Sequence, residues 1–241
     1  MGKETFTMKM RRATREIHAI SDALVNAKLA FALSDNHVWA EGLLVFYEIF
    51  RCLEEAMVSL KDTHVGELHI EGMQRTEAFE KDLSFYLGPD WMKTYKPRDS
   101  VTEYLIHLKK LQSSDPNQLI AYIYHLYMGL LSGGQILRKK RAVVKKFIPF
   151  SSEQTYQDAV THFGAVSISK LKRDLVEAVN RIAEGLDDET KEKLIKESKT
   201  VFLMNNKVIR SIESAQEVIL KKLLTIIIVL SLVVILYYII F

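Results

Sequence analysis

The sequence predicts an all-α protein with one globular domain and an apolar segment after it. Apolar residues recur three and four positions apart along most of the chain, which is the period of an amphipathic helix. Only 4 prolines and 10 glycines occur among 241 residues, so this pattern is seldom interrupted. No stretch alternates apolar and polar residues as a half-buried strand does. We therefore expect a single multi-helical domain in which helices pack on helices.

The first two helices are expected over residues 8–31 and 37–61. Ser34, Asp35 and Asn36 lie between them. Short polar side chains of this kind end one helix and cap the next, because their oxygen atoms accept from the backbone N–H groups of a first turn. The break between the two helices is therefore placed at these three residues.

Two further helices are expected over residues 72–87 and 100–111. The first should stop at Gly88 and Pro89, because proline disfavours helix at the residue before it and has no N–H donor. Ser100 is a suitable cap for the second.

Asp115 and Pro116 predict the start of the next helix, with Asp115 as N-cap and Pro116 at the first helical position. A looser stretch around Pro149 follows. The remaining pattern predicts one helix over residues 168–182 and another running from residue 188 without interruption into the apolar segment.

The apolar segment, residues 223–241, has no charged residue and consists almost wholly of Leu, Ile, Val, Tyr and Phe. As a helix it would span about 28 Å, close to the roughly 30 Å hydrocarbon core of a bilayer. Lys221 and Lys222 precede it, and the positive-inside tendency keeps such residues cytosolic. We expect a C-terminal transmembrane anchor in membrane lipid, joined by a short basic segment at 216–222 to a cytosol-facing body at 1–215. A buried core helix is the alternative.

Charge and cysteine content exclude other classes of protein. The formal net charge is +3, and acidic and basic residues alternate along the helices, so we expect no nucleic-acid partner. Cys52 is the single cysteine, so the chain has no intrachain disulfide and nothing requires an oxidising compartment.

One face of the first helix carries residues suited to a metal-containing ligand. Arg11, Arg15, His18 and Asp22 are four, three and four residues apart and therefore share a stripe. A histidine flanked by arginines can hold a metal centre that bears carboxylates, as heme with its propionates does, and Asp22 could accept the His18 ring proton. A solvated charged face is the alternative.

Three glycines interrupt an apolar helical pattern at YHLYMGLLSGGQ, which runs from Tyr124 to Gln135. Gly129, Gly133 and Gly134 each cost a helix interior about 1 kcal/mol relative to Ala. Either a flat ligand lying against the backbone or a tight helix crossing would explain them. The letters LSGGQ also occur in transport ATPases, but no GxxxxGK[ST] phosphate loop accompanies them here.

The remaining histidines show no metal-ligand spacing with cysteine or acidic residues, so we interpret them as surface or core residues. They are His37, His64, His69, His107, His125 and His162. The basic run 138–141, with Lys145 and Lys146, is either a solvated face or a docking surface for an acidic partner such as an electron-donating reductase.

Four ordered stretches resemble the heme oxygenase family over residues 11–205. They are REIHAISD around His18, DLSFYLGPDW from Asp82 to Trp91, YxxYxGxLSGGQ from Tyr124, and KTVFLMN from Lys199 to Asn205. The resemblance implies a heme-oxygenase-like catalytic domain over residues 1–215 that grips heme between two helices.

The resemblance also implies an activity. His18 would ligate the iron of heme, which is both cofactor and substrate, and Gly129 and Gly133 would lie as catalytic residues above the oxygen-binding side. O2 and electrons from NADPH, delivered by an NADPH-dependent cytochrome reductase, would open the ring to biliverdin, carbon monoxide and ferrous iron. The protein would lie in the endoplasmic reticulum membrane, and a biliverdin reductase could take the product.

The same resemblance assigns the remaining heme contacts. Arg11, Arg15 and Lys172 would meet the propionates, whereas the other contacts would come from Asp22, Tyr124, Gly134, Phe202 and Asn205.

Four positions depart from the family pattern, and each replaces a polar group by an apolar one. Leu130 stands where the family has a distal Asp, Leu126 where it has an Arg, Phe50 where it has a Tyr, and Val176 where an Arg pairs with a propionate. We expect an altered rate or an altered site of ring opening. A non-catalytic heme-binding or heme-sensing membrane-anchored protein is the alternative, and a purely structural helical protein is a third.

Overall fold

The computed structural model describes residues 4–29, 35–146 and 158–240. Within these ranges it contains helices and turns but no strand, which confirms the predicted all-α class there. The α-helices are α1 (Phe6–Leu29), α2 (Asn36–Ser59), α3 (Thr76–Leu87), α4 (Trp91–Thr94), α5 (Asp99–Ser114), α6 (Leu119–Gly129), α7 (Gln135–Lys146), α8 (Ile168–Gly185), α9 (Asp188–Arg210) and α10 (Ser214–Ile240). Short 3₁₀ turns occupy Gly66–Leu68 and Pro116–Gln118, and a π-helical turn occupies Leu130–Gly134.

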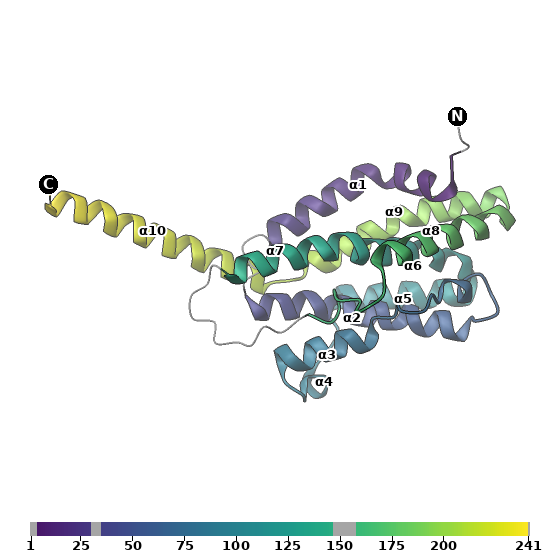
Figure 1. Ribbon diagram of the computed structural model, residues 1–241, viewed down its shortest axis with the longest axis horizontal. Coiled ribbons are helices and arrows are strands. Elements are labelled where there is room, and N and C mark those ends of the chain that lie inside the picture. Colours follow the sequence, from purple (N-terminus) through teal and green to yellow (C-terminus); the bar gives the residue numbers. More distant parts are fainter. Residues whose placement is uncertain (1–3, 30–34, 147–157, 241) are drawn as a thin grey trace.

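Helix α9 forms the centre of the body. It packs against α1 and α6 and also contacts α2 and α5. Figure 1 shows α1 running along the upper side of the body and α3 and α4 on the opposite side, beyond α2. Helices α1 and α6, which carry most of the site residues predicted from the sequence, therefore share α9 as a neighbour.

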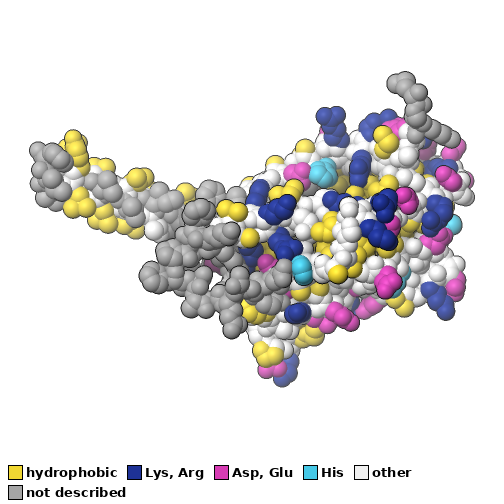
Figure 2. Space-filling view, in the orientation of Figure 1, with side chains coloured by type: hydrophobic (Ala, Val, Ile, Leu, Met, Phe, Trp, Pro, Cys, Tyr) yellow, Lys and Arg dark blue, Asp and Glu magenta, His cyan; other side chains and the backbone are white. Residues whose placement is uncertain are grey.

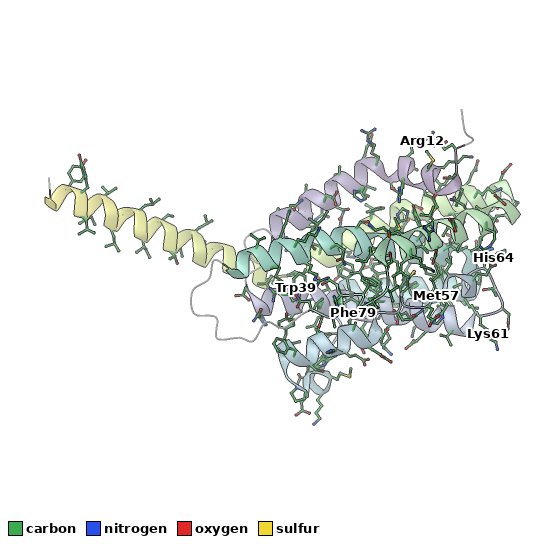
Figure 3. The ribbon with its side chains drawn as sticks, in the orientation of Figure 1. Arg12, Trp39, Met57, Lys61, His64 and Phe79 are labelled. Carbon is green, nitrogen blue, oxygen red and sulfur yellow. The ribbon has the colours of Figure 1, made fainter. Side chains whose placement is uncertain are left out.

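The core is built from the apolar faces of these helices. Met57 of α2 and Phe79 of α3 are 2% exposed or less, and Figure 3 shows both inside the body, whereas Arg12 and Lys61 lie at its rim. Complete burial of one such side chain stabilises the fold by about 1.5–3 kcal/mol relative to exposure.

The predicted cap of the second helix is confirmed. The Asp35 carboxylate accepts hydrogen bonds from the backbone N–H groups of His37 and Val38, at 2.9 and 3.1 Å. These two donors have no partner within the helix, so the side chain fixes where α2 begins.

The third helix starts later than the predicted residue 72. Gly72 has a φ of 83°, which is a left-handed conformation that cannot continue into a right-handed helix, and α3 begins only at Thr76. Its end agrees with the prediction, because Leu87 is followed by Gly88 at a φ of 90°.

The helical start predicted at Asp115 and Pro116 is confirmed in position, but the first turn is a 3₁₀ turn and lacks the expected side-chain cap. Pro116–Gln118 forms a 3₁₀ turn, and α6 follows it from Leu119. The Asp115 carboxylate accepts from the side-chain amide of Gln118 at 2.9 Å and caps no backbone N–H group.

The uninterrupted helix predicted from residue 188 into the apolar segment is wrong. Helix α9 ends at Arg210, and α10 starts at Ser214. The break is stabilised by Lys28 of α1, whose ammonium donates to the carbonyl oxygens of Arg210 and Ile212 at 2.8 and 2.6 Å. A cation at the carbonyl end of a helix satisfies its last acceptors.

Helix α10 extends away from the body in Figure 1. Among the described residues, none of the helices combines the length and the apolar character needed to cross a membrane. The looser stretch predicted around Pro149 falls outside the described residues, as do residues 30–34 and Phe241.

Candidate functional site

The predicted stripe on α1 lies at the surface of the helix. Arg11, Arg15, His18 and Asp22 are all exposed. The Nδ1 atom of His18 lies 3.0 Å from Asp22 Oδ2, and 56% of the His18 side chain is exposed. A carboxylate can only accept, so we assign the proton to Nδ1, which leaves the Nε2 lone pair of a neutral imidazole available to a metal.

A phenyl ring from α9 brings His18 close to a second histidine. Phe202 lies 5.4 Å from the His18 ring and 5.0 Å from the His125 ring, measured between centroids. The residue-based interpretation of His125 as an ordinary surface or core residue missed this arrangement. One local signal was available, because His125 precedes Gly129 by four residues and so shares its helical face.

His125 is electrostatically unusual. Its Nε2 atom is buried and has no hydrogen-bond partner. Burial of the ring, together with the His18 ring when it is protonated and the Arg11 guanidinium, lowers the pKa of His125 to about 3. The imidazole is therefore neutral at physiological pH, and one nitrogen is left without a partner.

The two glycines predicted to be catalytic border open space. A Cβ atom added at Gly129 or at Gly133 would meet nothing within 4 Å beyond the local helix backbone. No described helix comes within 4 Å of these two Cβ positions, which argues against the tight-crossing explanation and favours a ligand lying against the backbone. At Gly134 a Cβ would instead meet Leu130 Cδ1 at 3.0 Å. This glycine therefore makes room for a side chain of its own helical segment.

The helix backbone changes form at these glycines. Leu130–Gly134 is a π-helical turn between α6 and α7. Turns of this kind insert one extra residue into a helix and occur frequently at functional sites. Two of the three glycines that interrupt the helical pattern, Gly133 and Gly134, therefore lie within a π turn, and Gly129 immediately precedes it.

Two hydrogen bonds connect α1 to the α6–α7 segment on either side of these residues. Arg11 Nε donates to the Tyr124 hydroxyl at 3.0 Å, and Lys140 Nζ donates to Asn26 Oδ1 at 2.9 Å. Along α1, His18 falls between the two bonds. Along the α6–α7 segment, Gly129 and Gly133 also fall between the two bonds. Both predicted halves of the site therefore lie between the same pair of hydrogen bonds.

Two cations, one on α1 and one on α8, have no partner among the described residues. Arg15 is exposed and Lys172 of α8 is half-buried, and neither forms a hydrogen bond or ion pair with any described residue. Figure 2 shows further Lys and Arg side chains across this face, with apolar atoms visible between them. Unpaired cations of this kind are suited to bind carboxylates.

The four residues that depart from the family pattern lie in the hydrophobic core or pack against it. Phe50 and Leu126 are buried, and the Phe50 ring lies 5.1 Å from the Tyr127 ring. Leu130 and Val176 are partly buried against the same core.

The predicted contact Asn205 is directed toward another part of the fold. Its side-chain oxygen accepts a hydrogen bond from the hydroxyl of the buried Tyr104 at 3.0 Å. Its amide therefore helps to hold α9 against α5.

A buried carboxylate on the α2 side of α6 was not predicted. Glu54 accepts from the Tyr127 hydroxyl at 2.8 Å and from the backbone N–H groups of Arg75 and Thr76. Burial and this carboxylate raise the pKa of Tyr127 well above its usual value. The Tyr127 hydroxyl therefore stays protonated and donates.

The basic run 138–141 does not form a single exposed face. Arg141 is 1% exposed, and its guanidinium lies 4.7 Å from the centre of the Trp39 ring. Lys139 is exposed, whereas Lys140 is bonded to α1. The side chains of Lys145 and Lys146 are outside the description of the structure.

Comparisons with known proteins agree with the fold and identify the family. The family profile described as Heme oxygenase matches residues 4–211. Human heme oxygenase 1 is 27% identical over 216 residues, which cover 87% of this chain and 71% of that protein. The crystal structure of heme oxygenase 2 from Chlamydomonas reinhardtii without heme is 27% identical, with a TM-score of 0.77 over 87% of this chain and 98% of that one. The structure of heme oxygenase-1 from Synechocystis in complex with heme has the same fold, with a TM-score of 0.79 at 24% identity over 95% of this chain and all of that one. A match over most of the chain, together with the shared fold, shows that this chain belongs to the heme oxygenase family.

Proposed function

We propose that this chain is a heme oxygenase that binds heme between α1 and the α6–α7 segment. The proposal rests on the open space at Gly129 and Gly133. These glycines and His18 lie between the same two hydrogen bonds that join α1 to the α6–α7 segment. Only backbone without side chains lets a flat macrocycle lie this close to a helix. The residues present fit heme, because they offer a neutral imidazole, a flat backbone surface and unpaired cations for the propionates.

Each part of the site has a distinct task. Asp22 holds the His18 ring in the tautomer and orientation that leave Nε2 free for iron. Arg15 and Lys172 supply the charges that a pair of carboxylates would need. Phe202, whose ring lies against the His18 and His125 rings, provides apolar surface that limits water in the site. Bound heme supplies the redox-active iron, and we propose that O2 and electrons from NADPH, delivered through a cytochrome reductase, complete the reaction to biliverdin, carbon monoxide and ferrous iron.

We also propose that the rate or the position of ring opening differs from the usual behaviour of the family. Leu130 and Leu126 place no carboxylate or guanidinium beside Gly129. A site without these groups holds protons and water less firmly on the oxygen-binding side. Val176 removes one cation that would orient a propionate, so the heme is less fixed in its rotation about the iron axis.

The decisive experiment is to load the purified protein with heme and then supply O2 and an electron donor. Products are separated by chromatography, and biliverdin isomers are quantified per electron consumed. We expect biliverdin, with more than one isomer present. A protein that binds heme but releases no biliverdin would instead be a heme carrier or sensor. Leu130→Asp, with Leu126→Arg added to give the carboxylate a partner, should raise the yield per electron.

We further propose that residues 223–241 anchor the protein in the endoplasmic reticulum membrane with the body in the cytosol. The support is the absence of charge in this segment and the exposure of its described apolar side chains, such as Ile227 and Ile228 at 58% each. Ending the chain before Leu223 should move the protein to the soluble fraction and leave heme binding unchanged. Persistent membrane association of the shortened chain would require a second determinant on the body.

A further inference from the structure

The arrangement of the two imidazoles around Phe202 has no explanation in a site that uses one histidine. The His18 and His125 rings are tilted by 59° and 65° to the same phenyl ring, at nearly equal centroid distances. They come from different helices, α1 and α6, which α9 holds together. Both rings contact one phenyl group, so the two imidazoles border the same part of the proposed site.

His125 also shares the open face of its helix. Residues 125, 129 and 133 are spaced by four, so the His125 side chain and the Cβ-free positions of Gly129 and Gly133 fall on one stripe. The His125 ring also lies 5.0 Å from the ring of its neighbour Tyr124, whose hydroxyl accepts from Arg11 of α1. The imidazole therefore borders the space that the glycines leave open.

The unpartnered Nε2 atom points to a ligand. A buried ring nitrogen without a hydrogen-bond partner is destabilising, and native proteins seldom retain one without a role. Within the described residues, nothing offers this nitrogen a donor or an acceptor. A neutral imidazole with a free nitrogen beside a proposed heme site is a competent iron ligand.

We infer that His125 is a second imidazole that can hold the heme iron in place of His18. The inference rests on the proposed heme site and goes beyond it, because it assigns two alternative ligands to one iron. The order of preference follows from the partners of the two rings. His18 is oriented by Asp22 and is the stronger ligand, whereas His125 has no carboxylate partner and binds iron when His18 is displaced or absent.

The test uses heme-loaded protein and spectroscopy of the iron ligand. Ferric and ferrous forms of the His18→Ala variant are compared with wild type by electron paramagnetic resonance and by the iron–histidine stretch in resonance Raman spectra. We expect the imidazole signature to persist in this variant with heme affinity about 10–100-fold weaker, because His125 lacks a carboxylate that orients it. The double variant His18→Ala/His125→Ala should lose the signature and regain it when free imidazole is added.

The matched control is His18→Ala/His64→Ala. His64 is exposed, bonded to Glu67, and labelled in Figure 3 at the end of the body away from α10. This control should keep the imidazole signature that the His125 double variant loses. Because His125→Ala removes a partly buried ring, His125→Phe serves as a second version of the double variant that fills the same space.

The outcomes separate this inference from the proposal on which it rests. If wild type shows no imidazole-ligated heme, the proposed heme site is wrong. If wild type shows it and His18→Ala loses it as completely as the double variants, the heme site stands and the inference about His125 is overturned. Loss of the signature in the His64 control would assign the second ligand to another residue and overturn the inference as well.

Discussion

The two sides of α6 differ in how their polar groups are satisfied. Toward α2, the Tyr127 hydroxyl and two backbone N–H groups all donate to the buried carboxylate of Glu54. Toward α1, His125 has a buried nitrogen without a partner, and Gly129 leaves open space. One side of this helix is thus completed by the protein itself, whereas the other side keeps an unpartnered nitrogen and open space, where we propose that heme binds. Substitutions on the two sides should therefore have opposite consequences for stability and for heme binding.

The largest effect on stability is expected from Glu54→Leu. The substitution leaves the Tyr127 hydroxyl and the N–H groups of Arg75 and Thr76 without an acceptor, which should cost about 3 kcal/mol of unfolding free energy. Urea unfolding of the variant and of wild type measures this loss of unfolding free energy. The control is Glu55→Leu on the next residue, which is exposed and loses only an ion pair with Arg51. Equal losses in the two variants would contradict the distinction between the two sides.

A pH dependence of about 2 kcal/mol is expected from His125 in the heme-free protein. Its pKa is about 3 in the folded chain and 6.5 in the unfolded chain, so between these values the unfolded chain binds a proton that the folded chain does not. Stability should therefore fall as the pH falls below 6.5, by up to about 2 kcal/mol at pH 5. Unfolding curves between pH 7.5 and 5 measure the slope. His125→Phe should flatten it, and an unchanged slope would assign the effect to other groups.

Gly129→Ala should separate folding from binding. The added methyl group meets nothing in the heme-free protein, so better helix propensity should raise stability by up to about 1 kcal/mol. Heme affinity should fall by about tenfold, or roughly 1.4 kcal/mol, because the methyl group occupies the space proposed for the macrocycle. Gly42→Ala is the matched control, since this α2 glycine also has nothing within 4 Å of its Cβ position. It should stabilise without weakening heme binding. Unimpaired binding by the Gly129 variant would place the ligand elsewhere.

The smallest effects are expected from Arg15→Ala and Lys172→Ala. Each should weaken heme binding by about 0.5 kcal/mol, because a solvent-exposed ion pair contributes only about 0–1 kcal/mol. Heme dissociation rates at low and high salt measure this, and the difference from wild type should shrink as salt screens the charges. Arg12→Ala serves as the control on the same helix, since Arg12 is paired with Glu4. The same change in all three variants would indicate a general charge effect.

Local features of the fold could be predicted from the sequence, and those that depend on distant contacts could not. The cap at Asp35 and the His18–Asp22 pair follow from neighbours within one turn of chain. The His125 ring packs against the ring of Phe202, which is distant in sequence and comes beside it only on folding. Arg141 illustrates the same limit, because it lies in a run of basic residues that predicts a solvated face, and yet its side chain is buried.

The break before α10 shows how a helical period can mislead. The residues from 188 onward keep an apolar pattern that does not reveal where α9 ends. The end is stabilised by Lys28, which comes from α1 and donates to the carbonyl oxygens of Arg210 and Ile212. A capping group that arrives from another helix leaves no signal in the sequence that it caps.

The π turn at Leu130–Gly134 also changes the rotational phase of everything that follows it. One residue of an α-helix corresponds to about 100° of rotation, so a turn with one extra residue presents α7 at a different angle from a straight continuation of α6. In the observed phase Arg141 points into the core, and Lys140 reaches Asn26 on α1. The insertion that opens the backbone beside Gly129 therefore also sets which side of α7 is buried, and a chain shortened by one residue here would lose both properties together.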